Sequence, residues 1–501
     1  MKGAKNIVVV GGGAAGWLTA LTLQKLFSTT QNITLIESDQ IGILGAGEGV
    51  VPSFNSFLFK ILKLPFYDFI KSTSATFKYC TAFKNWNGKE EFWVNAFAPT
   101  TIQHYDKVIN KAPFIKDTIT NRYDMVIPHA FHFDASLLAK FLKENALKRG
   151  IHRIEGKVVS FNNDTNGFIK EIVFEDGRKV NSDFVFDCSG FKRLIIGKHY
   201  NSRWICLKHR FPGKAALPFF LDIDKEYKPY TLTTAMKHGW MWKIPLQHRY
   251  GSGYIFDSDY ITVDQAKEEV EQYLGHSIKP VNLFKYSPGY YEKICIKNCM
   301  AVGLSTGFSE PLDSNALGVV VTLLNTGVLS ETNTFVKMLS DLNNETYKEE
   351  FNKLHLDTVN NWHSGIQVHY LTKRTDSLFW KEFRTKYKIY DSLLDLLERH
   401  KTIRLEDDPV MKDGLPPFPL FNWLTIFKNK ELLNTDLYTS KQIGTDIFTA
   451  ENDLNDCYME PLMDKNYFVN NITKNWGITG YEPLDLKTKR SYRLLQRFNS
   501  F

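Results

Sequence analysis

The sequence predicts an α/β fold in which a mainly parallel sheet carries a nucleotide-binding turn. Three observations support this prediction. Residues 5–10 form an apolar run that enters a glycine-rich turn and then a helical stretch. A second apolar run at 33–36 ends on the acid Glu37. Two later apolar runs, at 183–188 and 300–303, each stop at a glycine-containing turn, as returning strands of one sheet would.

The chain has 501 residues, enough for a large core and more than one domain. Enzymes with a nucleotide-binding core often weave a second module through it, so two interleaved modules are expected. We predict a discontinuous core at 1–200 and 285–345, an inserted sheet region at 201–284, and a mainly helical, substrate-side module at 346–501. The proline-rich string at 415–420 is the best candidate linker, because prolines lack the N–H group that a helix uses.

Composition narrows the function classes. The net charge of +7 is spread over 62 basic and 55 acidic residues without a charged block, which favours small anionic ligands over nucleic acid. Six cysteines without paired spacing favour a reducing compartment and predict neither disulfides nor a metal site. The sequence shows neither a signal peptide nor a run of about 18 apolar residues, so a cytoplasmic protein without membrane contact is expected.

The first functional element is the turn Gly-x-Gly-x-x-Gly at 11–16. A dinucleotide needs a tight turn after the strand, close backbone approach to the pyrophosphate, and a helix whose first N–H groups face the anion. These are the features of a Rossmann-type core; the alternative is a glycine turn that binds nothing. The predicted cofactor-binding residues here are Gly11, Gly13, Ala14, Ala15 and Gly16, with Glu37 for a ribose hydroxyl.

The later strands indicate which dinucleotide is bound. Residues 183–187 lead into a Ser-Gly turn, and the strand at 300–302 ends at Gly303, which is predicted to contact the cofactor. Such a late return of the chain favours FAD over NAD. Cys188 is predicted to be a small buried apolar residue rather than a redox centre. Asp134 is predicted to cap a helix running to about residue 148, with a structural role.

Four further stretches carry a resemblance. They read GEGVVPS at 47–53, FKYCTAFKNW at 77–86, GWMWKIP at 239–245 and EPLDS at 310–314, and further similarity runs through 369–380. In this order and at these distances they resemble the flavin-dependent halogenases, above all the tryptophan halogenases. The likeness spans roughly residues 5 to 380.

The resemblance implies roles for two of these stretches. Glu48, Gly49 and Val50 match the segment that straps the flavin. The third stretch matches the family's WxWxIP signature, which lines the passage between flavin and substrate; its wall residues are Trp240, Trp242, Ile244 and Pro245. A period of two places both tryptophans on one face of a strand, as a wall requires. A core strand without function is the alternative.

The resemblance also implies a reaction. Reduced FAD takes up oxygen to give a C4a-hydroperoxide, a halide attacks it, and the resulting hypohalous acid travels to a lysine. An electron-rich aromatic carbon then attacks the halogen. The expected cofactors and cosubstrates are FAD as FADH2, O2 and chloride, bromide or iodide, and the expected partners are a separate flavin reductase and a small aromatic substrate.

Lys78 matches the family's lysine, and Lys84 in the same stretch is the competing candidate. The partner carboxylate, which stabilises the developing cation or accepts the ring proton, maps onto Asp313, where the family usually has glutamate. Because aspartate is one methylene shorter, Glu310 is kept as a second catalytic candidate.

The family commonly places Ser-Thr-Gly after that carboxylate, where backbone N–H groups help to bind the halide. This chain has Ser314, Asn315 and Ala316 at these positions, so the amides are kept while their surroundings change. A helix N-terminus suits an anion whatever the side chain. We therefore hypothesise an altered halide preference.

The resemblance fades beyond His400, and the substrate is left open among indoles, phenols and pyrroles. C-terminal aromatic candidates for a substrate seat are Phe418, Phe421, Trp423, Tyr467 and Trp476. Two other functions stay open: a flavin monooxygenase that hydroxylates an aromatic ring, and a non-catalytic flavin-binding relative.

Overall fold

The computed structural model describes residues 3–27, 31–42, 47–98, 128–225, 227–329, 334–411 and 418–438, together with three short strands at 111–116, 123–125 and 462–464. Its central sheet has six strands in the order β10, β2, β1, β14, β23, β22. In that order they span His152–Glu155, Asn32–Glu37, Asn6–Val10, Phe184–Asp187, Cys299–Ala301 and Cys295–Ile296. All neighbours pair in parallel except β22 with β23, which confirms the predicted α/β core.

The two faces of this sheet are covered differently. Ile7 and Val9 of β1 join a core with helices α1 (Ala14–Phe27), α6 (Ala135–Lys148) and α8 (Asn315–Leu329). Val8 and Val10 alternate to the other face and pack on the small sheet β11 (Val158–Asn163), β12 (Ile169–Phe174) and β13 (Lys179–Asn181). This alternation is the period of two that a strand buried on both faces requires.

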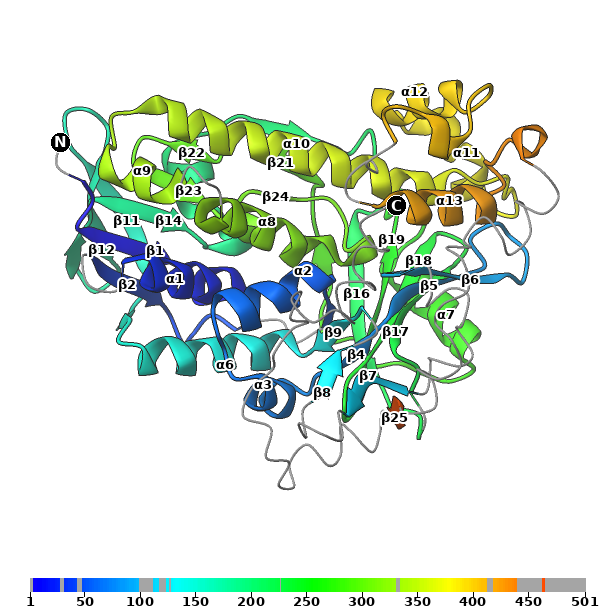
Figure 1. The fold of residues 1–501 in the computed structure, drawn as a ribbon, viewed down its shortest axis with the longest axis horizontal. Helices are drawn as coiled ribbons and strands as arrows, with labels where there is room; N and C mark the ends of the chain where they lie inside the picture. The colour runs from blue at the N-terminus through cyan, green and yellow to red at the C-terminus, as the bar shows by residue number, and fades with distance from the viewer. Residues whose placement is uncertain are drawn as a thin grey trace.

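The long helix α10 (Glu345–Tyr370) lies beside α8 and α9 (Thr334–Ser340) in Figure 1, and all three contact one another. It runs from the central sheet toward the second half of the molecule, where α11 (Leu378–Lys386), α12 (Asp391–Arg399) and α13 (Leu420–Asn429) follow. The described part after residue 345 is thus mainly helical. Residues 415–417 of the predicted linker lie outside the described residues, and Leu420 already begins α13.

A second sheet has seven strands in the order β20, β16, β19, β18, β17, β5, β6. They span Phe284–Lys285, Ala215–Leu221, Tyr250–Phe256, Gly239–Pro245, Tyr230–Ala235, Cys80–Lys84 and Phe92–Ala96. Only β17 and β5 pair in parallel within this described sheet. Because β5 and β6 come from the segment 1–200, this sheet draws on more than the predicted insertion at 201–284.

A small sheet joins the two halves, in the order β3 (Glu48–Gly49), β9 (Ala130–Phe133), β4 (Thr76–Lys78). After β9, the Asp134 side chain accepts hydrogen bonds from the N–H groups of Ser136 and Leu137, which confirms the predicted helix cap. Two residues that the sequence analysis singled out, Glu48 and Lys78, therefore lie on the two edge strands of one three-stranded sheet.

The remaining helices and strands connect these units. They are α2 (Pro52–Asn55), η1 (Ser56–Ile61), α3 (Phe66–Ser72), β7 (Lys111–Lys116), β8 (Tyr123–Met125), η2 (Gly190–Lys192), η3 (Leu194–His199), β15 (Trp204–Cys206), α7 (Val263–Leu274), β21 (Gly289–Tyr291), η4 (Gly303–Ser305), β24 (Gly307–Phe308), η5 (Leu312–Ser314), η6 (Leu405–Asp407), η7 (Thr435–Leu437) and β25 (Leu462–Asp464). Among the described residues, no helix is long and apolar enough to cross a membrane. The cysteines in this part of the chain, Cys188 included, are unpaired.

Candidate active site

The glycine turn after β1 has the geometry of a dinucleotide site. Gly11 has a φ of +121°, and a Cβ there would lie 2.1 Å from the carbonyl oxygen of Cys188. A Cβ on Gly16 would lie 1.8 Å from the carbonyl oxygen of Gly11, so the helix packs too closely for a side chain. A Cβ on Gly13 would meet nothing within 4 Å. Gly11 and Gly16 thus shape the turn, and Gly13 keeps its backbone open to a ligand.

Glu37 is the last residue of β2 and lies beside this turn. Its Oε1 atom contacts Lys143 Nζ and Arg153 Nε, both at 2.6 Å. Its Oε2 atom lies 1.6 Å from the position that a Cβ on Gly12 would occupy, so only glycine fits there. The first turn of α1 has no acidic residue of its own, and the Glu37 carboxylate beside the turn is paired with Lys143 and Arg153. The residues present fit the adenosine and pyrophosphate parts of FAD.

Gly303 brings the late strand back to the same place. It follows β23 with a φ of +79°, and a Cβ there would lie 2.6 Å from the Cβ of Ala15 at the start of α1. Gly303 and Ala316 also line one pocket with about 470 Å³ of empty space, part of it open to solvent, together with Trp362 and His363 of α10. A predicted cofactor residue and a predicted halide residue therefore share one hollow.

Lys78 ends β4 and is only 1% exposed. Its Nζ donates a 2.6 Å hydrogen bond to Ser314 Oγ and lies 5.6 Å from the ring centre of Phe97. Burial lowers the Lys78 pKa to about 8, and the charge of Asp313 partly offsets this effect. The competing Lys84 ends β5, is half-buried and lies 6.0 Å from the exposed Tyr273 ring. Lys78 is therefore the lysine at the predicted halide segment.

Asp313 is buried on a strained backbone. Both Asp313 and Ser314 have a φ of +60°, in the left-handed region of backbone conformation that residues other than glycine rarely adopt. Asp313 Oδ2 lies 2.8 Å from Nε2 of His369, in the last turn of α10. Strain of this kind persists only where surrounding contacts hold it, and it gathers at functional sites.

Glu310 has a different environment. It is fully buried, and both carboxyl oxygens accept a 3.0 Å hydrogen bond from the Tyr370 hydroxyl. Burial raises the Glu310 pKa to about 8, and the Tyr370 hydrogen bond partly offsets the rise. Asp313 is the carboxylate whose charge acts on Lys78, while Glu310 is engaged with Tyr370.

The predicted strap lies against the lysine site. A Cβ on Gly49 would lie 2.9 Å from Ser314 Oγ, the atom that Lys78 also contacts, and 3.2 Å from His132 Cδ2. Burial and the nearby Asp134 raise the pKa of Glu48 to about 7. Val50, which follows Gly49 in the strap, is fully buried. The strap, the lysine and the start of α8 therefore meet at Ser314.

The WxWxIP stretch forms β18, and its alternation is as predicted. Trp240, Trp242 and Ile244 share one cluster, and Met241 faces another. The rings of Trp240 and Trp242 are 6.2 Å apart. The Pro245 carbonyl accepts a 2.6 Å hydrogen bond from Thr76, two residues before Lys78. A Cβ on Gly47 would lie 3.6 Å from Ile244, so the wall reaches both the strap and the lysine strand.

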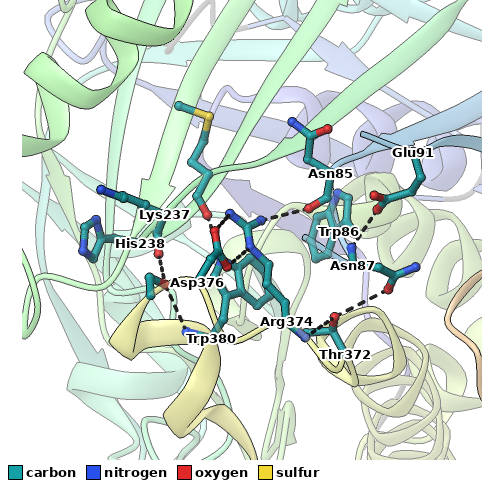
Figure 2. A network of polar contacts seen from close by, with 12 residues as sticks. Asn85, Trp86, Asn87, Glu91, Lys237, His238, Thr372, Arg374, Asp376 and Trp380 are labelled. Atoms are coloured by element: carbon teal, nitrogen blue, oxygen red, sulfur yellow. Dashed lines mark hydrogen bonds and ion pairs between the residues drawn. The ribbon is translucent and has the colours of Figure 1, made fainter. Parts of the chain in front are cut away.

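The segment after α10 fastens the turn between β5 and β6. In Figure 2, Arg374 lies between Asp376 and the carbonyl of Asn85, and its distances are 2.5 and 2.9 Å to Asp376 and 2.9 Å to Asn85. Its guanidinium is also 4.9 Å from the Trp380 ring. Within the same turn, the Glu91 carboxylate accepts a 2.6 Å hydrogen bond from the Asn87 N–H. Residues 374–380 of the similar stretch thus hold this hairpin.

Two histidines near the site had no predicted functional role. His132 of β9 is buried and contacts Thr231 Oγ1 at 2.9 Å; burial and the Lys78 charge hold its pKa well below its usual value. His369 contacts Asp313. Their sequence neighbourhoods are those of an ordinary strand and helix, so only the tertiary contacts identify them.

The C-terminal aromatic candidates lie only partly within the described residues. Phe418 is buried with its ring 6.2 Å from His369, Trp423 is buried beside it, and Phe421 is half-buried. Tyr467, Trp476 and the Asn315 side chain lie outside the described residues. In the part that is described, no group of three or more His, Cys, Asp or Glu residues could hold a metal ion.

The sequence is similar to tryptophan halogenases over most of its length. The sequence profile of the family described as Tryptophan halogenase matches residues 6–118 and 106–436. The tryptophan 7-halogenase RebH of Lentzea aerocolonigenes is 27% identical, with 82% of this chain and 84% of RebH covered. The tryptophan 6-halogenase ThaL of Streptomyces albogriseolus is 28% identical over the same shares.

Solved structures agree with the fold. BrvH, a flavin-dependent halogenase from Brevundimonas, superposes with a TM-score of 0.77 at 25% identity, with 94% of this chain and 99% of BrvH covered. A tryptophan halogenase from Shewanella frigidimarina superposes with a TM-score of 0.80 at 23% identity, over 95% and 99% of the two chains. The architecture of this chain is thus found in solved halogenase structures over nearly its whole length.

Proposed function

Because the chain belongs to the tryptophan halogenase family, we propose that it uses reduced FAD, molecular oxygen and a halide to halogenate an electron-rich aromatic small molecule. The observation that carries this proposal is the buried Lys78 amine, which contacts Ser314 at the entrance of α8. Burying an amine costs free energy, and amines with perturbed pKa values gather at functional sites.

The cofactor would be held by the turn after β1, by Glu37 and Gly303, and by the strap at Glu48, Gly49 and Val50. Bound FAD supplies the oxidising chemistry that converts halide into hypohalous acid. This chain's own residues bind the pyrophosphate at the N-terminus of α1 and place Gly303 beside the same helix. We further propose that a separate flavin reductase delivers the reduced cofactor.

The halide would bind at the N-terminus of α8, where the backbone amides of Ser314, Asn315 and Ala316 lie. The Ser314 N–H already donates to the Pro311 carbonyl at 3.3 Å, so the first N–H groups of α8, at Asn315 and Ala316, and the helix dipole would favour an anion there. The wall of Trp240, Trp242, Ile244 and Pro245 would line the passage between flavin and aromatic substrate, since it contacts both the strap at Gly47 and the lysine strand at Thr76.

Lys78 would receive the hypohalous acid, either through a hydrogen bond or as a haloamine. In the hydrogen-bonded route, the aromatic carbon forms a bond to halogen, the hydroxide takes a proton from the Lys78 ammonium and leaves as water, and the ring proton passes to Asp313. In the haloamine route, water leaves as the N–X bond forms, and the aromatic carbon then takes the halogen from nitrogen while the ring proton passes to Asp313. Its charge already acts on Lys78, and its side chain is buried beside Ser314. Glu310 is the second candidate for this acid–base role.

The test supplies the protein with reduced FAD, oxygen and bromide and offers a panel of indoles and phenols. We expect ring bromination by the wild type, and loss of bromination with retained flavin oxidation in Lys78→Ala. Unchanged bromination in that variant would reassign the lysine role to Lys84. If the wild type brominates nothing on the panel but oxidises NAD(P)H alone, the halogenase proposal is wrong and an aromatic monooxygenase is favoured.

A further inference from the structure

We propose that His369 is a positioning residue that holds the Asp313 carboxylate in its working orientation. This inference rests on the proposed function, because it assigns a task to Asp313 in ring halogenation. It concerns a residue far from Asp313 in the sequence, brought to it by the last turn of α10.

The contact itself is short and buried. His369 Nε2 lies 2.8 Å from Asp313 Oδ2; His369 is 0% exposed and Asp313 is 8% exposed. An ionised carboxylate only accepts hydrogen bonds, so the proton of this bond is carried by Nε2. A charge-assisted bond in a water-poor site fixes the carboxylate more firmly than a surface contact would.

The direction of this bond is set by aromatic packing. The His369 ring stacks on Phe83 of β5, with centroids 4.5 Å apart and planes 12° apart. Phe83 in turn stacks on Trp93 of β6 at 4.2 Å, and Phe418 meets His369 edge-on at 6.2 Å. The stacking fixes the plane of the imidazole, and in that plane Nε2 faces Asp313.

The polar contacts of His369 go to Asp313 alone among the described residues, because its Nδ1 has no hydrogen-bond partner there. A second buried histidine of α10 behaves differently. His355 Nε2 contacts the Tyr291 carbonyl of β21 at 3.0 Å and thereby joins the helix to a strand. His369 fastens no backbone; it fastens one side chain, which is what a positioning role requires.

The pairing also accounts for aspartate at this position. With a φ of +60°, the backbone suits Asp better than a longer side chain, since Asp and Asn are enriched in the left-handed region. A glutamate would carry its carboxylate farther by one C–C bond, about 1.5 Å. It would then overrun the position at which Oδ2 meets His369. Asp313 and His369 thus act as one unit, with Oδ1 left for the reacting ring.

The first test does not need turnover. In full-length protein labelled with ¹⁵N-histidine, we expect the His369 signal, assigned by its absence in His369→Gln, to show a proton on Nε2. In Asp313→Asn, the Nε2 signal should move, because the acceptor loses its charge. A bare Nε2 in the wild type, or an unchanged signal in Asp313→Asn, would overturn the proposal.

The second test is kinetic. His369→Phe keeps the stack on Phe83 and removes the donor, so kcat for ring bromination should fall roughly 10- to 100-fold, the range for a hydrogen bond to a charged group. KM for the arene should change less than about threefold, and hypobromite collected by an external trap should persist. His369→Gln, whose amide can reach the Nε2 position, should recover most of kcat.

Two controls separate positioning from folding. His355→Phe removes an equally buried histidine of the same helix and should lower the melting temperature without the loss in kcat. The double variant His369→Phe with Asp313→Asn should be no slower than Asp313→Asn alone, because both changes remove one interaction. If His369→Phe keeps the wild-type kcat, this inference is wrong while the halogenase proposal stands. If the wild type halogenates nothing, both are wrong.

Discussion

Lys78 and Ser314 meet through a 2.6 Å hydrogen bond from Nζ to Oγ, although one ends β4 and the other precedes α8. The same Ser314 oxygen lies 2.9 Å from where a Cβ of Gly49 would be. Any side chain on the strap at that position would push into the serine that the lysine holds. The strap, the Lys78 amine and the entrance of α8 all contact the Ser314 hydroxyl, so a substitution in any one of them should shift the other two.

The Lys78 pKa should appear in the pH dependence of halogenation. Burial lowers this pKa to about 8, so the ammonium form dominates below pH 8 and the neutral amine above it. If the ammonium donates a hydrogen bond to hypohalous acid, kcat for ring bromination should fall as the pH rises through about 8. The measurement is a pH–rate profile. The control variant Lys84→Met should show the same fall in kcat through about pH 8. A rise in kcat through pH 8 would instead identify the neutral amine and hence a haloamine.

Glu310→Gln should stabilise the protein in a pH-dependent way. The folded pKa of about 8 exceeds the usual 4.5, so the folded state holds its proton longer than the unfolded state. Stability is therefore lost as pH rises from 4.5 to about 8, at about 1.4 kcal/mol per pKa unit. Glutamine is neutral and keeps an acceptor for Tyr370. The melting temperatures of variant and wild type should agree near pH 5 and diverge by pH 9, with the variant higher. A constant difference across this range would contradict the assignment of a buried, protonated Glu310.

Gly13→Ala should weaken FAD binding while leaving the apoprotein stable. The added Cβ meets no protein atom within 4 Å, so it projects into the space that a dinucleotide approaches. Titration with FAD should show at least about a tenfold increase in Kd. In contrast, Gly11→Ala places a Cβ 2.1 Å from the Cys188 carbonyl at a φ of +121° and should lower the melting temperature itself. If Gly13→Ala binds FAD as the wild type does, the cofactor does not approach this turn.

The nucleotide core could be predicted from sequence because its signals are local. The glycine turn, the apolar strands and Glu37 each follow from steric or charge requirements within a few residues. The alternation in β18 was predictable for the same reason, since a period of two fixes which face Trp240 and Trp242 share.

The candidate site could be predicted only in part. The identity of Lys78 came from the resemblance, but its burial and its contact with Ser314 depend on β4 packing against a helix entrance 236 residues later. The parallel pairing of β5 with β17 has no local signal in the sequence. The sequence analysis therefore placed the second sheet within the insertion at 201–284 and did not include β5 and β6. His369 lies 56 residues from Asp313 at the end of a long helix, and no spacing rule links the two.

Arg374→Lys should destabilise the fold through the hairpin that follows β5. Lysine cannot reproduce the fork to Asp376 together with the bond to the Asn85 carbonyl, which then keeps only the Gly88 N–H as its donor, at 3.3 Å. Urea unfolding should show a loss of about 1–3 kcal/mol. The neighbouring Lys373→Met, which removes an exposed ion pair with Glu431, should stay within about 0.5 kcal/mol. Equal effects of the two substitutions would mean that the network in Figure 2 contributes no more than a surface pair.

Restoring Thr and Gly at positions 315 and 316 should change halide preference. The amides that bind an anion remain in both forms, but the packing around them differs, and Ala316 borders the hollow that Gly303 also lines. The double variant Asn315→Thr, Ala316→Gly should therefore alter the ratios of turnover with chloride, bromide and iodide, measured in parallel at saturating arene. Thr326→Ser, farther along α8, is the matched control and should keep the wild-type ratios. If all three ratios are the same in the double variant as in the wild type, the side chains at 315 and 316 do not set the halide preference.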